Sequence, residues 1–86
     1  MEFKKTLKEC KGIKLSLEKD SKEIARATLY VMSNDLHNEP FGLLEDVMVD
    51  EELRGQGIGT ELVKSIIEEA KKENCYKVIA TSRHAR

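Results

Sequence analysis

The chain has 86 residues, which is enough for one small domain and too short for two. Hydrophobic residues make up 40% and charged residues 36%, with 15 Lys+Arg against 16 Asp+Glu. A net charge of −1 provides little electrostatic attraction to nucleic acid or to an anionic membrane. We therefore expect a soluble globular domain that has neither as a partner.

The N-terminal residues lack the apolar core of a signal peptide. The longest apolar run, Leu29 to Met32, is far shorter than the roughly 20 residues that cross a bilayer. These features favour a cytoplasmic protein with reduced thiols. Cysteines and histidines are too few and too far apart for a disulfide framework or a metal-ligand cluster, so no metal is expected; they are Cys10, Cys75, His37 and His84.

The first half of the chain reads as strands. Residues 1–11 fit either a short amphipathic turn or an extended arm, because Phe3, Leu7 and Cys10 recur at helix-like spacing. Apolar and polar residues then alternate from Ile13 to Glu18, which is typical of a half-buried strand. A polar turn at residues 19–22 leads to a second strand over residues 23–32, so these two strands are predicted to form an antiparallel hairpin.

The second half adds a strand, a helix and a strand. After a polar loop over residues 33–40, a third strand is expected from Phe41 to Val49, with Gly42 marking a bulge or a close approach. A glycine-rich loop follows, and apolar residues at 3.6-residue spacing predict a helix from Ile58 to about residue 73, with Asn74 at its end. Residues 76–81 form a last strand, parallel to the third. The predicted fold is α+β: a mixed sheet in the order β-β-β-α-β, as one domain over residues 1–86.

Glycines before a helix create an anion site, because the first helical turn has unpaired N–H groups and the helix dipole is positive there. The P-loop motif fails, since no lysine follows the glycines until Lys64. The dinucleotide fingerprint also fails, because the sixth position from Gly55 is Thr60. A third pattern, [QR]-x-x-G-x-[GA], is satisfied in full by Arg54-Gly55-Gln56-Gly57-Ile58-Gly59.

With this loop, the strand Leu44-Glu45-Asp46-Val47-Met48-Val49 and the helix that follows, residues 12–86 resemble the GNAT superfamily of acetyl-CoA-dependent N-acetyltransferases. The resemblance implies that the third and last strands splay apart to admit the pantetheine arm of acetyl-CoA. It also implies a cofactor site in three parts. The coenzyme pyrophosphate is expected to bind backbone N–H groups of the glycine loop, which includes Gly55; the donors are Gln56, Gly57, Ile58, Gly59 and Thr60. Main-chain groups of Val47, Met48 and Val49 are expected to bind the pantetheine and the thioester carbonyl. Ser82 is expected to add a further contact. Arg54 either contacts phosphate or pairs with the acidic run at residues 50–52.

Glu45 matches the glutamate proposed as a base in relatives with the same strand motif. It is a candidate for the base or for binding the amine, with a solvated carboxylate at the sheet rim as the alternative. Asp46, its neighbour, is expected on the opposite face of the strand. Asp35, His37 and Glu39 are candidates for lining the acceptor entrance, although an ordinary surface loop explains them equally well.

Complete members of the superfamily continue with a further helix and two strands, which often carry the general acid, whereas this sequence stops at Arg86. We therefore expect a truncated member that transfers an acetyl group to the primary amine of a small molecule or peptide. The alternative is a non-catalytic CoA-binding or dimerisation module. An unpaired edge on the strand at residues 76–81 predicts a homodimer.

Overall fold

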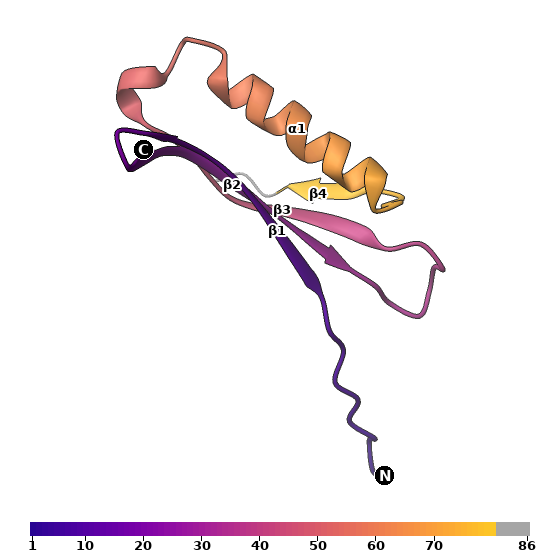
Figure 1. Cartoon of the computed structure of the whole chain (residues 1–86). Coiled ribbons are helices and arrows are strands. Elements are labelled where there is room, and N and C mark those ends of the chain that lie inside the picture. The colour runs from indigo at the N-terminus through magenta and orange to yellow at the C-terminus, as the bar shows by residue number, and fades with distance from the viewer. Residues whose placement is uncertain (81–86) are drawn as a thin grey trace, which may run out of the picture.

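The computed structural model describes residues 1–80 as a four-stranded mixed sheet with one long helix on one face (Figure 1). The elements in chain order are β1 (Lys11–Lys19), β2 (Lys22–Met32), β3 (Phe41–Val49), the 3-10 turn η1 (Glu51–Leu53), α1 (Ile58–Lys72) and β4 (Val78–Ala80). Strands β1, β2 and β3 are antiparallel neighbours, and β4 lies parallel to β3. The predicted α+β fold is confirmed. The last strand is shorter than expected, and Thr81 lies outside the described residues.

The hairpin between β1 and β2 has a two-residue turn. Asp20 and Ser21 both have positive φ, at 55° and 63°. Two successive positive φ angles are the signature of a type I′ turn, whose twist matches that of the two strands it joins. The predicted antiparallel hairpin is therefore present, and its turn sets the register of the sheet from its first edge.

Residues 1–10 have no regular secondary structure and run away from the sheet (Figure 1). Phe3 and Leu7 are 89% and 85% exposed, so neither packs against the body of the molecule. One ion pair joins the arm to the loop after β2, between Lys8 Nζ and Asp35 Oδ1 at 3.2 Å. Of the two expectations for this segment, the extended arm is the one observed.

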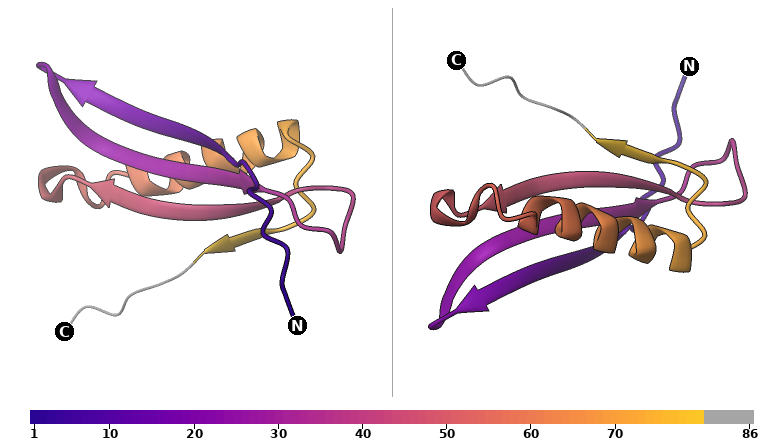
Figure 2. Two further views of the ribbon diagram at one scale, coloured as in Figure 1. Left: turned by 90° about the horizontal axis from the view of Figure 1, so that it is seen from below. Right: turned by 90° about the horizontal axis from the view of Figure 1, so that it is seen from above.

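The core lies between the sheet and α1. Ala25, Ala27 and Leu29 alternate along β2 and are fully buried on the face that α1 covers. Ala27 and Leu29 form one buried cluster with Ile66 and Ala70 of the helix. The buried stripe of α1 is narrower than its apolar pattern, because Ile67 remains 42% exposed. Figure 2 shows that α1 covers one face of the sheet, and no described element covers the other.

The end of α1 is formed as the sequence predicts. Asn74 has a φ of 63°, and its N–H donates to the carbonyl of Lys71 at 3.0 Å. The next N–H, of Cys75, donates to the carbonyl of Ala70 at 3.0 Å. This pair of bonds is a Schellman motif, which satisfies the last carbonyls of the helix. It turns the chain directly toward β4.

No helix in residues 1–80 is both long and apolar enough to cross a membrane.

Candidate functional site

The glycine loop between η1 and α1 depends on two left-handed residues. Gly55 and Gly57 have φ angles of 86° and 80°. A Cβ added at either position would meet no atom within 4 Å, so space is not what requires glycine there. The requirement is conformational, because L-residues other than glycine are strained at these angles. The open space beside both glycines is also what a ligand needs in order to approach the backbone.

The first turn of α1 is left uncapped by protein side chains. Gly57 is the N-cap residue and makes no side-chain cap hydrogen bond. The first intrahelical bond runs from the N–H of Glu61 to the carbonyl of Gly57, at 3.0 Å. The N–H groups of Ile58, Gly59 and Thr60 precede that bond. Because they lie at the positive end of the helix dipole, these groups are suited to bind an anion.

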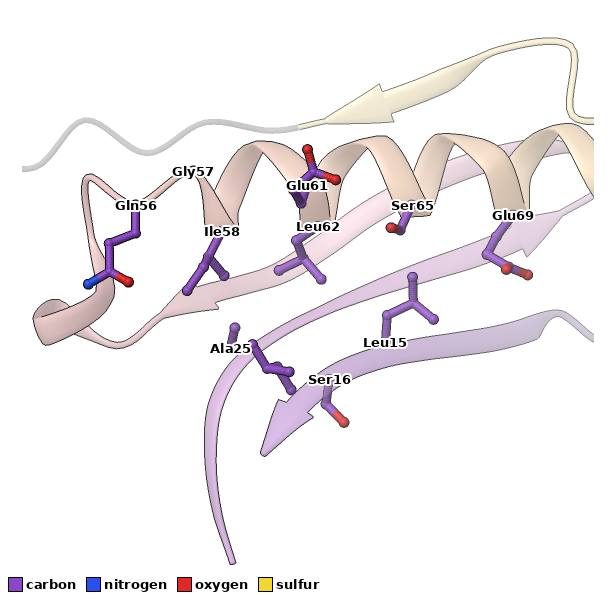
Figure 3. A pocket seen from close by; sticks show the side chains of 11 residues that line it. Leu15, Ser16, Ala25, Gln56, Gly57, Ile58, Glu61, Leu62, Ser65 and Glu69 are labelled. Carbon is purple, nitrogen blue, oxygen red and sulfur yellow. The ribbon is translucent and has the colours of Figure 1, made fainter. Parts of the chain in front are cut away.

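A pocket of about 340 Å³ opens beside this turn. It brings together most of the predicted loop residues with the end of β3; its lining is Val49, Leu53, Arg54, Gly55, Gly57, Gly59 and Thr60. The side chains of Gln56 and Ile58 face the other side of α1. There they line a groove of about 440 Å³ between the helix and β1, with Leu15, Leu17 and Leu62 among its walls (Figure 3). Gln56 and Ile58 can therefore serve the predicted anion site only through their backbone.

The side chain of Arg54 lines this pocket, and its contact with a phosphate stays a prediction. Its Nε donates to the carbonyl of Val49 at 3.4 Å, which places the guanidinium beside the pocket. Among residues 1–80 it forms no ion pair with the acidic run at residues 50–52. The cation nevertheless acts on that run at longer range, because it is one of the charges that lower the pKa of Asp50.

Strand β3 contains a bulge that the sequence analysis did not anticipate. Thr28 pairs with Glu45, whereas Arg26 pairs with Met48, so Ala27 alone faces two residues of β3. Asp46 sits in this bulge with a φ of 56°. Gly42 was expected to mark either a bulge or a close approach. It marks a close approach, since an added Cβ would lie 2.7 Å from Leu29 Cδ1.

The bulge corrects the predicted orientation of Asp46. The side chain of Arg26 lies on the face away from α1, because its neighbours Ala25 and Ala27 are buried against the helix. Arg26 binds both carboxylate oxygens of Asp46, at 3.0 and 3.1 Å. Glu45 pairs with Thr28 on that same face. Both carboxylates therefore share one face, because a bulge interrupts the alternation that would separate neighbours.

Within residues 1–80, the edge of β3 opposite β2 is paired only near its start. The described part of β4 ends at Ala80 and pairs with Gly42, Leu43 and Leu44, so no described residue pairs with the bulge or with the residues after it on this edge. The N–H of Asp50 donates to the carbonyl of Ile24 at 2.7 Å, so Asp50 faces β2. Alternation then turns the main chain of Met48 toward β2 as well and that of Val47 and Val49 toward the open edge. The expected main-chain contacts are therefore available from Val47 and Val49, not from Met48.

The loop at residues 33–40 lies at the other end of β3 from the glycine loop. His37 packs on Tyr76, with ring centroids 4.2 Å apart, and the N–H of Tyr76 donates to the carbonyl of Pro40 at 2.9 Å. These contacts tie the loop to the start of β4, where β3 and β4 are still together. The loop therefore lies at the start of β3, and the expected role of Asp35, His37 and Glu39 at the acceptor entrance stays a prediction.

Glu45 is half-buried on the uncovered face of the sheet, next to the bulge. Ser82 lies outside the described residues. No group of three or more His, Cys, Asp or Glu side chains within residues 1–80 is placed to hold a metal ion.

Arg26 is the residue that sequence reasoning missed. The only sign of this contact in the sequence is Asp46, an aspartate inside a predicted strand, because aspartate tolerates a positive φ better than most residues.

Comparison with known proteins places this site in a family. The sequence model of the Acetyltransferase (GNAT) family matches residues 3–86. "Probable glucosamine 6-phosphate N-acetyltransferase 2" of Oryza sativa subsp. japonica is 39% identical over 61 residues, which cover 70% of this chain and 37% of that protein.

Solved structures give the same result. Glucosamine-6-phosphate N-acetyltransferase from Arabidopsis thaliana superposes with a TM-score of 0.78 at 28% identity, covering 84% of this chain and 51% of that one. An acetyltransferase from Trypanosoma brucei superposes with a TM-score of 0.70 at 31% identity, covering 74% of this chain and 46% of that one. The present chain thus spans about half or less of these relatives. Its fold, its glycine loop and the family match over residues 3–86 establish that the chain belongs to the GNAT acetyltransferase family.

Proposed function

We propose that this chain binds acetyl-CoA and transfers its acetyl group to a primary amine. The observation that carries the proposal is the pocket at the start of α1, which reaches Val49 on the edge of β3 that no described residue pairs with. The pocket supplies N–H donors and the Thr60 hydroxyl for a pyrophosphate. The adjacent edge of β3, which reaches this pocket at Val49, supplies main-chain groups for a pantetheine arm that extends from the pyrophosphate.

The residues of this chain have separate parts in the reaction. The amine nitrogen attacks the thioester carbonyl carbon, the new C–N bond forms, and the C–S bond breaks to release the thiolate. Main-chain N–H groups of Val47 and Val49 lie on the edge where they can stabilise charge on the carbonyl oxygen. Glu45 either accepts the proton that the amine loses or binds the protonated amine before that proton leaves. The departing thiolate takes up a proton from solvent.

The acceptor proposed for the first assay is an amino sugar phosphate. Relatives that share 39% and 28% identity with the chain are named for glucosamine 6-phosphate. Their names alone support this choice, so the assay includes a polyamine and an N-terminal peptide amine as rival acceptors. The substrate class common to all three is a primary amine.

A single position tests the cofactor site without disturbing the fold. Gly59 is helical, and an added Cβ would meet only Val49 Cγ2, at an ordinary 3.8 Å. Gly59→Glu places an acidic side chain in the first turn, where it favours the helix but repels a pyrophosphate. Gly59→Ala is the matched control, since the loop pattern accepts alanine there.

The measurement is thermal unfolding against acetyl-CoA concentration. Ligand at 100 times its Kd adds about 2.7 kcal/mol to the free energy of unfolding. For a domain of this size the shift in Tm is roughly 10 °C or more. We expect the shift in the unchanged chain and in Gly59→Ala, and none in Gly59→Glu. A folded chain that acetyl-CoA never stabilises would contradict the proposal.

Turnover separates an enzyme from a non-catalytic CoA-binding module. Acetylated amine is measured by mass spectrometry, and Glu45→Gln is compared with the unchanged chain. Loss of a catalytic base lowers the rate by about 100-fold or more, while the Kd for acetyl-CoA stays unchanged. Acetyl-CoA binding with no product from any amine would favour the binding module.

We also propose that the chain forms a homodimer through β4. Within residues 1–80, β4 pairs with β3 on one side only, and Ile79 on this strand is 38% exposed. An exposed edge of this kind readily pairs with another edge. Sedimentation equilibrium is expected to give twice the chain mass, and a monomer at all concentrations would rule the dimer out.

A further inference from the structure

The ion pair between Arg26 and Asp46 is the best-formed polar contact on the uncovered face of the sheet. Arg26 Nε and Nη2 donate to the two oxygens of Asp46, at 3.0 and 3.1 Å. The two residues are 20 positions apart, so the contact spans β2 and β3. A guanidinium that binds both oxygens fixes orientation as well as distance, which a lysine cannot do.

Arg26 is itself held from a second side. Its Nη1 donates to Glu23 Oε2 at 3.1 Å, and Glu23 also pairs with Lys14 Nζ at 2.6 Å. The guanidinium therefore lies between two carboxylates, one on its own strand and one in the bulge. This arrangement leaves it little freedom to turn toward solvent.

The partner of Arg26 is the strained residue of the bulge. Asp46 has a φ of 56°, a region that costs an L-residue free energy even though aspartate tolerates it better than most. A regular strand is the lower-energy local alternative for residues 45–47. Some contact from outside β3 has to favour the bulge, and the two bonds from Arg26 reach the residue that carries the positive φ.

The bulge decides which main-chain groups face the open edge. Before it, the N–H of Gly42 donates to the carbonyl of Lys77 at 2.9 Å, so even-numbered residues face β4. Without the bulge, that alternation would continue and would turn residues 46 and 48 toward β4. With it, Val47 and Val49 face the edge and Asp50 faces β2. One extra residue thus reverses which N–H groups of β3 face β2 and which face the open edge.

We propose that Arg26 is a positioning residue, which holds the bulge so that Val47 and Val49 present their main-chain groups to the pantetheine and thioester of acetyl-CoA. The inference rests on the proposed function for the identity of the ligand. Arg26 touches neither ligand nor reacting atoms, and it acts through Asp46. Its removal should affect the part of the ligand that lies along β3 and spare the part at the glycine loop.

The experiment compares two ligands in two variants of the full chain. Acetyl-CoA spans both parts of the site, whereas ADP carries the pyrophosphate but no pantetheine. Arg26→Met removes the bidentate contact and keeps much of the side-chain length. Lys11→Met is the control, because it removes another cross-element ion pair, to Glu73 at 2.9 Å, at the far end of the sheet from the glycine loop.

Arg26→Met is expected to raise the Kd for acetyl-CoA about tenfold while the Kd for ADP stays within about twofold. Lys11→Met should change neither. An equal loss for both ligands in Arg26→Met would assign a general structural role and overturn the inference, as would no loss for either. If the unchanged chain binds ADP but gains nothing from the pantetheine of acetyl-CoA, the proposed function fails instead.

A measurement without ligand tests the bulge itself. A residue with positive φ gives a strong NMR cross-peak between its own amide and Hα protons, which is weak in a regular strand. Asp46 should give this signal in the unchanged chain and in Lys11→Met, and lose it in Arg26→Met. A persistent signal in Arg26→Met alone would overturn the inference whatever the ligand results.

Discussion

Glycine has a different function at each position around the site. Gly55 and Gly57 are required for their positive φ angles, and the space around them is open. Gly42 has an ordinary φ but lies against Leu29, which is fully buried. Gly59 is constrained by neither angle nor space, so alanine fits at this position, as the loop pattern allows. The same residue type thus serves conformation at Gly55 and Gly57 and packing at Gly42.

Gly42→Ala tests the close approach. The new Cβ would lie 2.7 Å from Leu29 Cδ1, a distance that forces a buried side chain to move. We expect the free energy of unfolding in urea to fall by about 1–3 kcal/mol. Gly12→Ala is the control, since its Cβ would meet Tyr30 at 3.4 Å and that ring is partly exposed. Equal stability of the two variants would contradict the packing argument.

The two cysteines should differ in reactivity. Cys10 is exposed on the N-terminal arm, whereas Cys75 is partly buried after α1. Burial raises the pKa of the Cys75 thiol, and nearby Glu73 raises it further, so less thiolate is present at neutral pH. We expect iodoacetamide to modify Cys10 first, with peptide mass spectrometry giving the order. Modification of Cys75 first would show that this region opens more readily than its packing indicates.

At the scale of the element, the two ends of α1 differ in how their hydrogen-bonding groups are satisfied. Its N-terminus is left open to a ligand by Gly57, and its C-terminus is closed by the Schellman motif at Asn74. The first arrangement leaves donors available, and the second satisfies acceptors. The helix therefore faces the pocket with its unsatisfied end and enters β4 with its satisfied one.

Asn74 provides the test of this ending. Its φ of 63° suits asparagine and glycine and strains alanine. Asn74→Ala should lower the free energy of unfolding by about 1 kcal/mol, and Asn74→Gly should leave it within about 0.5 kcal/mol. Chemical denaturation of both variants measures the difference. A loss of the same size in both would mean that the asparagine side chain, and not its backbone angle, stabilises the turn.

For the whole molecule, the sheet has one covered face and one uncovered face. Few large side chains are completely buried among the described residues, and Leu29 and Ile66 are the largest of them. The uncovered face carries the charged network of Lys14, Glu23, Arg26 and Asp46. Polar contacts on this face therefore contribute to a stability that the core alone provides only in part.

Acid should destabilise the fold through these contacts. The N–H of Glu52 and then the ammonium of Lys22 hold the pKa of Asp50 below its usual value. Lys14 and then Arg26 lower the pKa of Glu23 in the same way. A carboxyl whose pKa is lower in the folded state stabilises it above the unfolded pKa, and this contribution disappears as pH falls through the folded pKa.

We therefore expect Tm to fall as the pH drops from neutrality below the usual carboxyl range. Asp50→Asn should have a lower Tm than the unchanged chain at neutral pH, and the gap should close in acid, because asparagine keeps the acceptor oxygen and loses only the charge. Asp50→Ala also loses the bond from the Glu52 N–H, at 3.1 Å, so part of its gap should persist in acid. A gap for Asp50→Asn that does not change with pH would contradict the assignment.

Local rules were enough to predict the elements and much of the site. Alternation located β1, the 3.6-residue period located α1, and Asn74 marked its end, because each pattern reports the surroundings of a short segment. The glycine spacing predicted the anion site for the same reason, since φ angles and unpaired N–H groups at a helix start are local properties.

The remaining features depended on pairing between distant segments. The register of β2 against β3 put Asp46 on the same face as Glu45, gave it Arg26 as a partner, and turned Val47 and Val49 toward the open edge. The tertiary contact of His37 with Tyr76 tied the loop at residues 33–40 to the start of β4. A one-residue bulge reverses which groups face each edge of a strand, and no alternation pattern within β3 records it. The sequence alone therefore determined the elements and the left-handed glycine loop, and only the tertiary structure decided which main-chain groups of β3 face the open edge.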